Sequence, residues 1–250
     1  MQPYFTYLLI QVLRLISRIF YRFEVNWIGD PPEDPWVDLR VVAVLNHTSL
    51  YEWLFAGVVP NRMIHQLAWH GVVPIAEKTA KRQFIGRFYG MIARHVVPIT
   101  RKRDHTWSEV LGRIEKDAMV ILLPEGRMKR STGLDLHGRP MTLRRGIADV
   151  IHSSQPGRFL IAYSGGLHHV QHPGETFPRL FKTIRMNLEN IDLVKYRQEW
   201  LEKAGEEGFR DAIKRDLERR RDLHCPEEES ITPKKPAPPT DSRGDQQDEP

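Results

Sequence analysis

The sequence predicts an α/β fold, with a largely parallel or mixed sheet flanked by helices. Short apolar runs rich in Val and Ile are typical of buried strands, and they alternate along the chain with segments of helical character. This alternation favours a sheet that is covered by helices on both faces. The expected strands are LRVVAVL (39–45), HVVPIT (95–100), MVILLP (119–124) and FLIAY (159–163), with MIHQLA (63–68) as a weaker candidate, and the expected helices cover 49–57, 76–89, 105–117 and 143–153.

The chain is long enough for one domain with appendages at its ends. Its last residues are rich in Pro and charge and contain almost no large apolar side chains, so we expect them to be disordered. We therefore divide the chain into an N-terminal amphipathic helix (1–24), an α/β domain (25–187), charged C-terminal helices (188–223) and a disordered tail (224–250). Gly205 and Gly208 indicate a break between two C-terminal helices.

The N-terminal segment YFTYLLIQVLRLISRIFYRF predicts an amphipathic helix that lies in a membrane interface. It is long enough to span a bilayer, but Arg14 and Arg18 would then lie in hydrocarbon, at about 2.5–3.5 kcal/mol each near its centre. An ordinary amphipathic helix docked on the domain is the alternative. At helical spacing, a polar stripe (Tyr4, Tyr7, Gln11, Arg14, Arg18, Arg22) opposes an apolar arc (Leu9, Val12, Leu13, Ile16, Ile19, Phe20, Phe23).

Charge is unevenly distributed along the chain, whose formal net charge is +5. From Cys225 onward, seven acidic residues against three basic residues give −4, which leaves +9 for the rest. Such a basic body indicates an anionic partner: nucleic acid, an anionic membrane surface or a phosphorylated substrate. Cys225 is the single cysteine, so no intramolecular disulfide can form and a reducing compartment is expected.

Polar residues follow the predicted strands at the points where they end. The ends of parallel strands form the edge at which open α/β sheets bind ligands, so we expect these residues to share one rim. They are Asn46-His47, Arg101-Lys102-Arg103, Pro124-Glu125-Gly126-Arg127 and Ser164-Gly165-Gly166.

His47 and Glu52 allow two interpretations. Ser49-x-x-Glu52 is a capping box, in which the serine and the glutamate accept hydrogen bonds from the first backbone N–H groups of a helix. Alternatively, Glu52 orients the imidazole of His47, whose other nitrogen then takes a proton from a substrate hydroxyl. The arginine cluster and second carboxylate expected at the same rim favour this second hypothesis, with an acceptor alcohol that carries an anionic group.

These residues resemble the motifs of the glycerolipid acyltransferase family, which includes 1-acylglycerol-3-phosphate and glycerol-3-phosphate acyltransferases. Asn46-His47-Thr48-Ser49-Leu50-Tyr51-Glu52 is similar to its first motif, N-H-x-S-x-x-D, with Glu in place of Asp. Gly90-MIARHVVPIT-Arg101 resembles the second motif. Leu123-Pro124-Glu125-Gly126-Arg127-Met128-Lys129-Arg130 resembles the third, F-P-E-G-T-R-S, and LRRGIADV (143–150) the helix after it.

The resemblance implies an acyltransferase that moves a fatty acyl group from acyl-CoA or acyl carrier protein to a lysophospholipid hydroxyl. It implies His47 as general base and Glu52 as its orienting acid. Arg101, with Arg127 or Arg130, is expected to bind the acceptor phosphate, together with Glu125, and Gly126 to let the backbone approach the ligand. No metal and no cofactor beyond the co-substrate is implied.

We expect the partners to be an anionic membrane surface on the cytoplasmic face, the acyl donor and the lysophospholipid, and no nucleic acid. A non-catalytic lipid- or acyl-carrier-binding relative is the alternative, and a basic nucleic-acid binder is a weaker one. His168, His169 and His172 make a metal site conceivable, but no carboxylate or Cys set at ligand spacing accompanies them, so we interpret them as polar loop residues.

Overall fold

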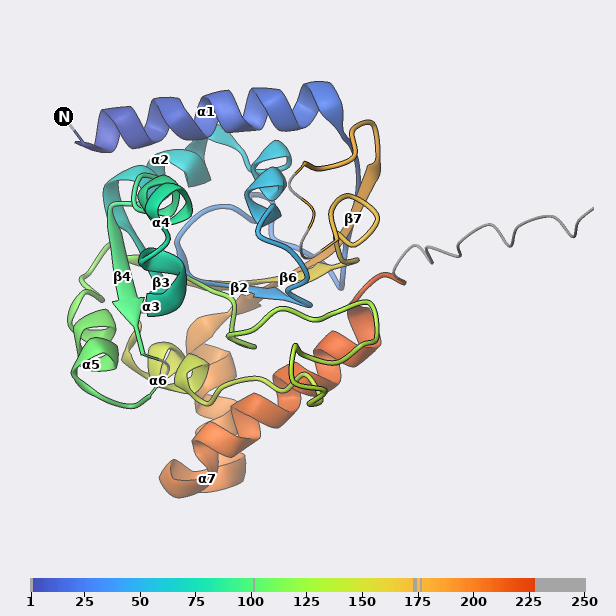
Figure 1. Cartoon of the computed structure of the whole chain (residues 1–250). Coiled ribbons are helices and arrows are strands. Elements are labelled where there is room, and N and C mark those ends of the chain that lie inside the picture. The colour runs from blue at the N-terminus through green and yellow to red at the C-terminus, as the bar shows by residue number, and fades with distance from the viewer. Residues whose placement is uncertain (1, 101, 173–174, 176, 228–250) are drawn as a thin grey trace, which may run out of the picture.

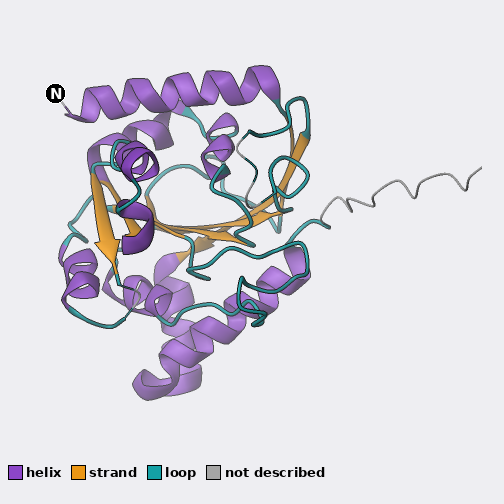
Figure 2. Ribbon diagram, viewed as in Figure 1, coloured by secondary structure: helices purple, strands orange, loops and turns teal. Residues whose placement is uncertain are grey.

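The computed structural model describes residues 2–100, 102–172, 175 and 177–227, and it contains a seven-stranded sheet with helices on both faces (Figures 1 and 2). The strand order is β1-β7-β6-β2-β5-β3-β4. The sheet is mixed, because β7 runs antiparallel to β6 and parallel to β1, whereas the other neighbours pair in parallel. The strands are β1 (Arg22–Trp27), β2 (Leu39–Leu45), β3 (Gly71–Ala76), β4 (His95–Ile99), β5 (Met119–Leu122), β6 (Arg158–Ser164) and β7 (Thr183–Asp192).

Alternating side chains of β2 build the core on both faces of the sheet. Val41, Ala43 and Leu45 pack into a buried cluster with α5 (His105–Gly112), α6 (Gly146–Ser153) and α7 (Leu193–His224). Val42 packs on the opposite face, against the 3₁₀ helix η1 (Glu52–Gly57) and α2 (Asn61–His70). The predicted α/β architecture with flanking helices is therefore confirmed.

Helix α1 (Gln2–Phe20) lies across η1 and α2 as the outermost element on its side of the sheet (Figure 1). Its polar stripe turns toward the domain: Arg14 hydrogen-bonds to Asn61, and Arg18 Nε donates to the Gly57 carbonyl at 2.8 Å. Its outward face is apolar, with Phe5, Leu8, Val12, Leu15 and Ile19 all exposed. Among the helices that the structure describes, none has the length and hydrophobicity required to cross a bilayer.

The prediction of a weak strand at residues 63–68 is wrong, because this segment lies in α2. Met63, Ile64 and Ala68 fall on the buried face of that helix, which is a helical and not a strand period. Residues 188–192, expected to begin the C-terminal helices, belong to β7, in which Ile184, Met186 and Leu188 are buried at alternate positions. Strands β1 and β3 were not expected either.

Several predicted helices are present but shorter. Residues 49–57 form only η1, and 76–89 divides into α3 (Glu77–Ala80) and α4 (Gln83–Tyr89). Helices α5 and α6 occupy the expected places. Asp104 caps the start of α5, and its side chain accepts a hydrogen bond from the Thr106 N–H. Residues 228–250 of the expected disordered tail lie outside the described residues.

The break predicted at Gly205 is confirmed, since its φ of 65° and ψ of 173° interrupt α7. This conformation is essentially restricted to glycine. The turn allows the part of α7 after it to place Phe209, Ile213 and Leu217 in the core.

We expect Gly205→Ala to lower the free energy of unfolding by about 1–3 kcal/mol, because an L-residue is strained at this backbone conformation. Gly112→Ala is the control: Gly112 ends α5, has no positive φ and has open space around its Cα, so alanine should be neutral or stabilising by up to about 1 kcal/mol. Urea unfolding of both variants measures the difference. Equal stability of the two would contradict the assigned strain.

Candidate active site

The ends of three adjacent strands, β2, β5 and β6, converge at one edge of the sheet. The Asn46 N–H donates to Glu125 Oε1 at 2.8 Å, and the Asn46 side chain donates to the Ser164 carbonyl at 2.9 Å. Asn46 has a positive φ of 67°, a conformation that Asn tolerates better than most residues and that turns the chain sharply after β2. Of the predicted rim of residues 46–47, 101–103, 124–127 and 164–166, these contacts bring together Asn46, Glu125 and Ser164.

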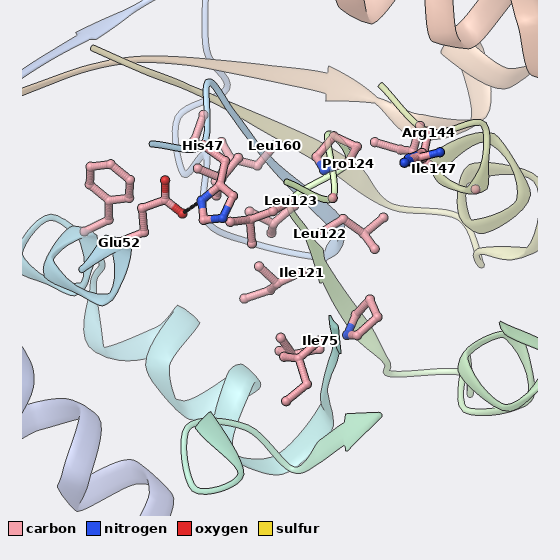
Figure 3. A pocket seen from close by; sticks show the side chains of 18 of the residues that line it. His47, Glu52, Ile75, Ile121, Leu122, Leu123, Pro124, Arg144, Ile147 and Leu160 are labelled. Carbon is pink, nitrogen blue, oxygen red and sulfur yellow. Dashed lines mark hydrogen bonds and ion pairs between the residues drawn. The ribbon is translucent and has the colours of Figure 1, made fainter. Parts of the chain in front are cut away.

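His47 and Glu52 face each other across this turn (Figure 3). His47 Nδ1 lies 2.6 Å from Glu52 Oε2, and the two side chains are only 14% and 9% exposed. The second oxygen of Glu52 accepts the Thr48 N–H at 3.0 Å. Glu52 thus orients the imidazole, as the second interpretation of this motif predicted, and also satisfies a backbone donor of the loop before η1.

Ser49 does not complete the expected capping box. Its hydroxyl accepts the Tyr51 N–H at 3.1 Å, and it donates to the Gln171 side chain at 2.8 Å. Tyr51, not Ser49, is the residue that precedes η1, and it makes no side-chain cap. The serine therefore ties the His47 loop to the segment after β6.

Glu125 is 1% exposed and holds the backbone on which His47 sits. Its two oxygens accept the N–H groups of Asn46 and His47, each at 2.8 Å. Burial raises the pKa of Glu125 above its usual range, and these two donors and the Arg221 guanidinium act in the opposite direction. In the described contacts Glu125 positions the backbone of His47; the role in acceptor binding that the resemblance implies stays a prediction.

The arginines expected to bind phosphate have different surroundings. Arg127 pairs with the nearly buried Asp135 and donates to the Thr142 hydroxyl at 3.2 Å, so its guanidinium stabilises the loop between β5 and α6. Arg130 lies in the same loop, does not line the cavity described below, and has a buried Nε without a partner among the described residues. Arg101 lies outside the described residues, and its place beside His47 stays a prediction.

The histidines after β6 support the loops around His47. His168 Nε2 lies 2.9 Å from the Lys129 carbonyl, and His169 Nε2 lies 2.8 Å from the Thr183 carbonyl. Lys129 in turn donates its backbone N–H to the His47 carbonyl at 2.7 Å. Across the described part of the chain, no group of three or more His, Cys, Asp or Glu side chains is arranged to hold a metal ion.

A cavity of about 700 Å³ opens beside His47 and Glu52. Figure 3 shows the imidazole above an aliphatic wall that includes Ile75, Ile121 and Leu160. Tyr89 also lines it, and its hydroxyl donates to the Leu50 carbonyl at 2.6 Å; burial, and then the nearby Glu52 carboxylate, raise the pKa of this hydroxyl. Further apolar lining comes from α1, η1 and α2: Ile10, Leu13, Phe55, Met63, Ile64 and Leu67.

Several cations at this cavity were not predicted from the sequence, and Arg144 is one of them. It lies just before α6, and its backbone N–H donates to the Pro124 carbonyl at 2.7 Å. The segment LRRGIADV had been noted for its helix, not for its arginines. A pair of arginines immediately before a helix that follows the third motif is the signal that could have identified it.

We expect the link between Asp135 and Arg127 to be pH-dependent. Hydrogen bonding from the Arg139 N–H, followed by pairing with Arg127, lowers the pKa of Asp135 to about 2. This pKa is below the pKa of an aspartate in the unfolded chain. The contribution of ionised Asp135 to stability is therefore complete above about pH 4 and is lost as the pH falls toward about 2. The difference in Tm between wild type and Asp135→Asn should therefore narrow over that range. Asp117→Asn, at an exposed carboxylate, controls for the lost charge; a constant difference would contradict the link.

Comparisons with known proteins agree with this geometry. The crystal structure of the 1-acyl-sn-glycerophosphate (LPA) acyltransferase PlsC from Thermotoga maritima is similar to this one, with a TM-score of 0.52 and 16% sequence identity over 86% of this chain and 78% of that one. This likeness shows a shared fold. No match was found among curated proteins. The model of the Acyltransferase family matches residues 32–161, which include His47, Glu52 and Glu125. Because that match covers more than half of the chain, the protein belongs to the Acyltransferase family, as its motifs predicted.

Proposed function

We propose that this acyltransferase moves a fatty acyl group from a thioester of coenzyme A or acyl carrier protein to the hydroxyl of a lysophospholipid of the 1-acylglycerol-3-phosphate type. The observation that carries the proposal is the His47–Glu52 pair at the edge of an apolar cavity. A base with an orienting carboxylate suits proton removal from an alcohol, and an apolar cavity suits an alkyl chain.

The proposed reaction needs one base and no nucleophile of the protein. The acceptor hydroxyl gives its proton to His47 Nε2 while its oxygen attacks the thioester carbonyl. The carbon–sulfur bond then breaks, and the leaving thiolate takes the proton from the imidazolium. Glu52, at 2.6 Å from Nδ1, fixes the tautomer and stabilises the imidazolium through both steps.

The aliphatic wall supports the assignment of the cavity to an acyl chain. Side chains of α1, η1, α2 and β3 provide apolar lining, and the polar lining includes His47, Glu52 and basic side chains. A chain bound there would place its thioester carbonyl next to the imidazole.

The outward face of α1 supports a membrane surface as partner. Phe5, Leu8, Val12, Leu15 and Ile19 form a continuous exposed apolar stripe at helical spacing. A second exposed apolar group continues it at the C-terminal end of α1, where the rings of Phe20 and Phe181 lie 5.9 Å apart: Phe177, Leu180 and Phe181. We propose that these residues rest in the headgroup layer at the cytoplasmic face of a membrane, from which the lysophospholipid enters.

We expect His47→Ala to lower kcat by at least about 10²–10⁴-fold, because it removes the general base. Glu52→Gln should lower kcat less, since it keeps the imidazole but weakens its orientation. Thiol release from acyl-CoA or acyl carrier protein in the presence of 1-acylglycerol 3-phosphate measures the rate.

His137→Ala is the matched control, because this exposed histidine lies in the loop between β5 and α6, away from the cavity. Near-normal turnover by folded His47→Ala would refute the base assignment. A wild type that binds lysolipid without any His47-dependent turnover would favour the non-catalytic alternative.

We expect the double variant Leu8→Glu/Leu15→Glu to reduce flotation with anionic liposomes by at least about tenfold, because two leucine side chains and their apolar area would no longer enter the interface. Leu136→Glu/Leu223→Glu adds the same charge at exposed leucines of the β5–α6 loop and α7, and it should float like the wild type. Equal flotation of the two double variants would contradict the proposed membrane face.

A further inference from the structure

At the basic rim of the cavity, two cations make no ion pair or side-chain hydrogen bond with the residues that the structure describes. Arg103 and Arg210 both pair with Asp149, at 3.8 and 2.9 Å. Arg145 pairs with Asp211 at 2.5 Å and Lys214 with Glu218 at 2.9 Å. Among the residues that the structure describes, six basic side chains line the cavity, and only two of them make no ion pair or side-chain hydrogen bond: Lys102 and Arg144.

Arg144 is the one attached to the turn that positions His47. Its backbone N–H donates to the Pro124 carbonyl, and the next residue, Glu125, holds the N–H of His47. Figure 3 shows the guanidinium and the imidazole on either side of the turn that Pro124 begins. The relative position of the two groups is therefore set by a single short segment of backbone.

The Arg144 side chain lies in van der Waals range of a side-chain position at Gly126. A Cβ built on Gly126 would lie 3.6 Å from Arg144 Cγ and 3.9 Å from its Nε, so the arginine stem passes directly over the glycine. The φ of Gly126 is +65°, which glycine adopts without strain. The close approach of a ligand that was expected at Gly126 stays a prediction.

We propose that Arg144 binds the anionic headgroup phosphate of the acceptor and determines the preference for phosphate-bearing acceptors. This inference rests on the proposed acyl transfer. It assigns to Arg144 the task expected of Arg127, whose guanidinium is engaged by Asp135 and Thr142. An exposed guanidinium can make two parallel hydrogen bonds to a phosphate, which a lysine cannot reproduce.

The two ends of the acceptor would then be fixed independently. Its hydroxyl meets the imidazole on one side of the Pro124–Gly126 turn, and its phosphate meets Arg144 on the other. An acceptor without phosphate would keep only the first of these contacts, so the contribution of Arg144 is specific to one class of acceptor.

The test compares Arg144→Gln, Arg144→Lys and the control Arg139→Gln, an exposed arginine that does not line the cavity. Steady-state kinetics are measured with 1-acylglycerol 3-phosphate and with monoacylglycerol as acceptors. We expect Arg144→Gln to lower kcat/KM for the phosphate acceptor by about 10- to 100-fold, mainly through KM, because a charge-assisted contact is lost. Monoacylglycerol turnover should change less than twofold, and Arg144→Lys should be intermediate. Tm should stay that of the wild type, since the side chain has no partner to lose.

Equilibrium binding of 1-acylglycerol 3-phosphate to the full-length protein without donor separates this inference from the proposed reaction. Weaker binding by Arg144→Gln than by Arg139→Gln supports the phosphate contact, whether or not the protein turns over. Binding and kinetics of Arg144→Gln equal to those of Arg139→Gln overturn it. A wild type without turnover would overturn the proposed function alone, and the binding comparison would still decide the role of Arg144.

Discussion

The two hydrogen bonds from the backbone of Asn46 and His47 to the Glu125 carboxylate are the contacts on which the site depends. They join the end of β2 to the end of β5. They hold the main chain of His47, and the contact with Glu52 holds its side chain. A carboxylate buried to this extent is costly unless it is hydrogen-bonded, so the arrangement is stable only when both donors are in place. The left-handed conformation at Asn46 and the turn at Gly126 are the backbone features that bring these N–H groups to the Glu125 carboxylate.

Glu52 satisfies a backbone donor at the same edge of the sheet. The loop after β2 leaves the sheet in partly buried surroundings, where an unpaired N–H is unfavourable. Glu52 accepts the Thr48 N–H with one oxygen and contacts His47 Nδ1 with the other. The orientation of the His47 imidazole and the local folding of the loop are therefore coupled. The longer side chain, compared with the aspartate of the resembled motif, spans both contacts here.

The sequence predicted the parts of this structure that depend on local pattern. The four strands with continuous apolar runs, the break at Gly205 and the pairing of His47 with Glu52 all follow from neighbouring residues. Strand β7 has no continuous apolar run and was missed, although its buried residues alternate with Arg185, Asn187 and Glu189 as in a half-buried strand. Its last residues were assigned to a helix. The contacts of Glu125 and the place of Arg144 depend on the spatial order β6-β2-β5 and on the turn at Gly126, which no local pattern contains.

Helix α1 has two faces with separate tasks. Ile10 and Leu13 form part of the cavity wall, whereas Leu8, Val12 and Leu15 point away from the protein. Side chains three and four positions apart lie on the same face of a helix, so residues of one face can change without altering the other face. Under the proposed function, the size of the acyl-chain cavity and the strength of attachment to lipid can therefore change independently within this nineteen-residue helix.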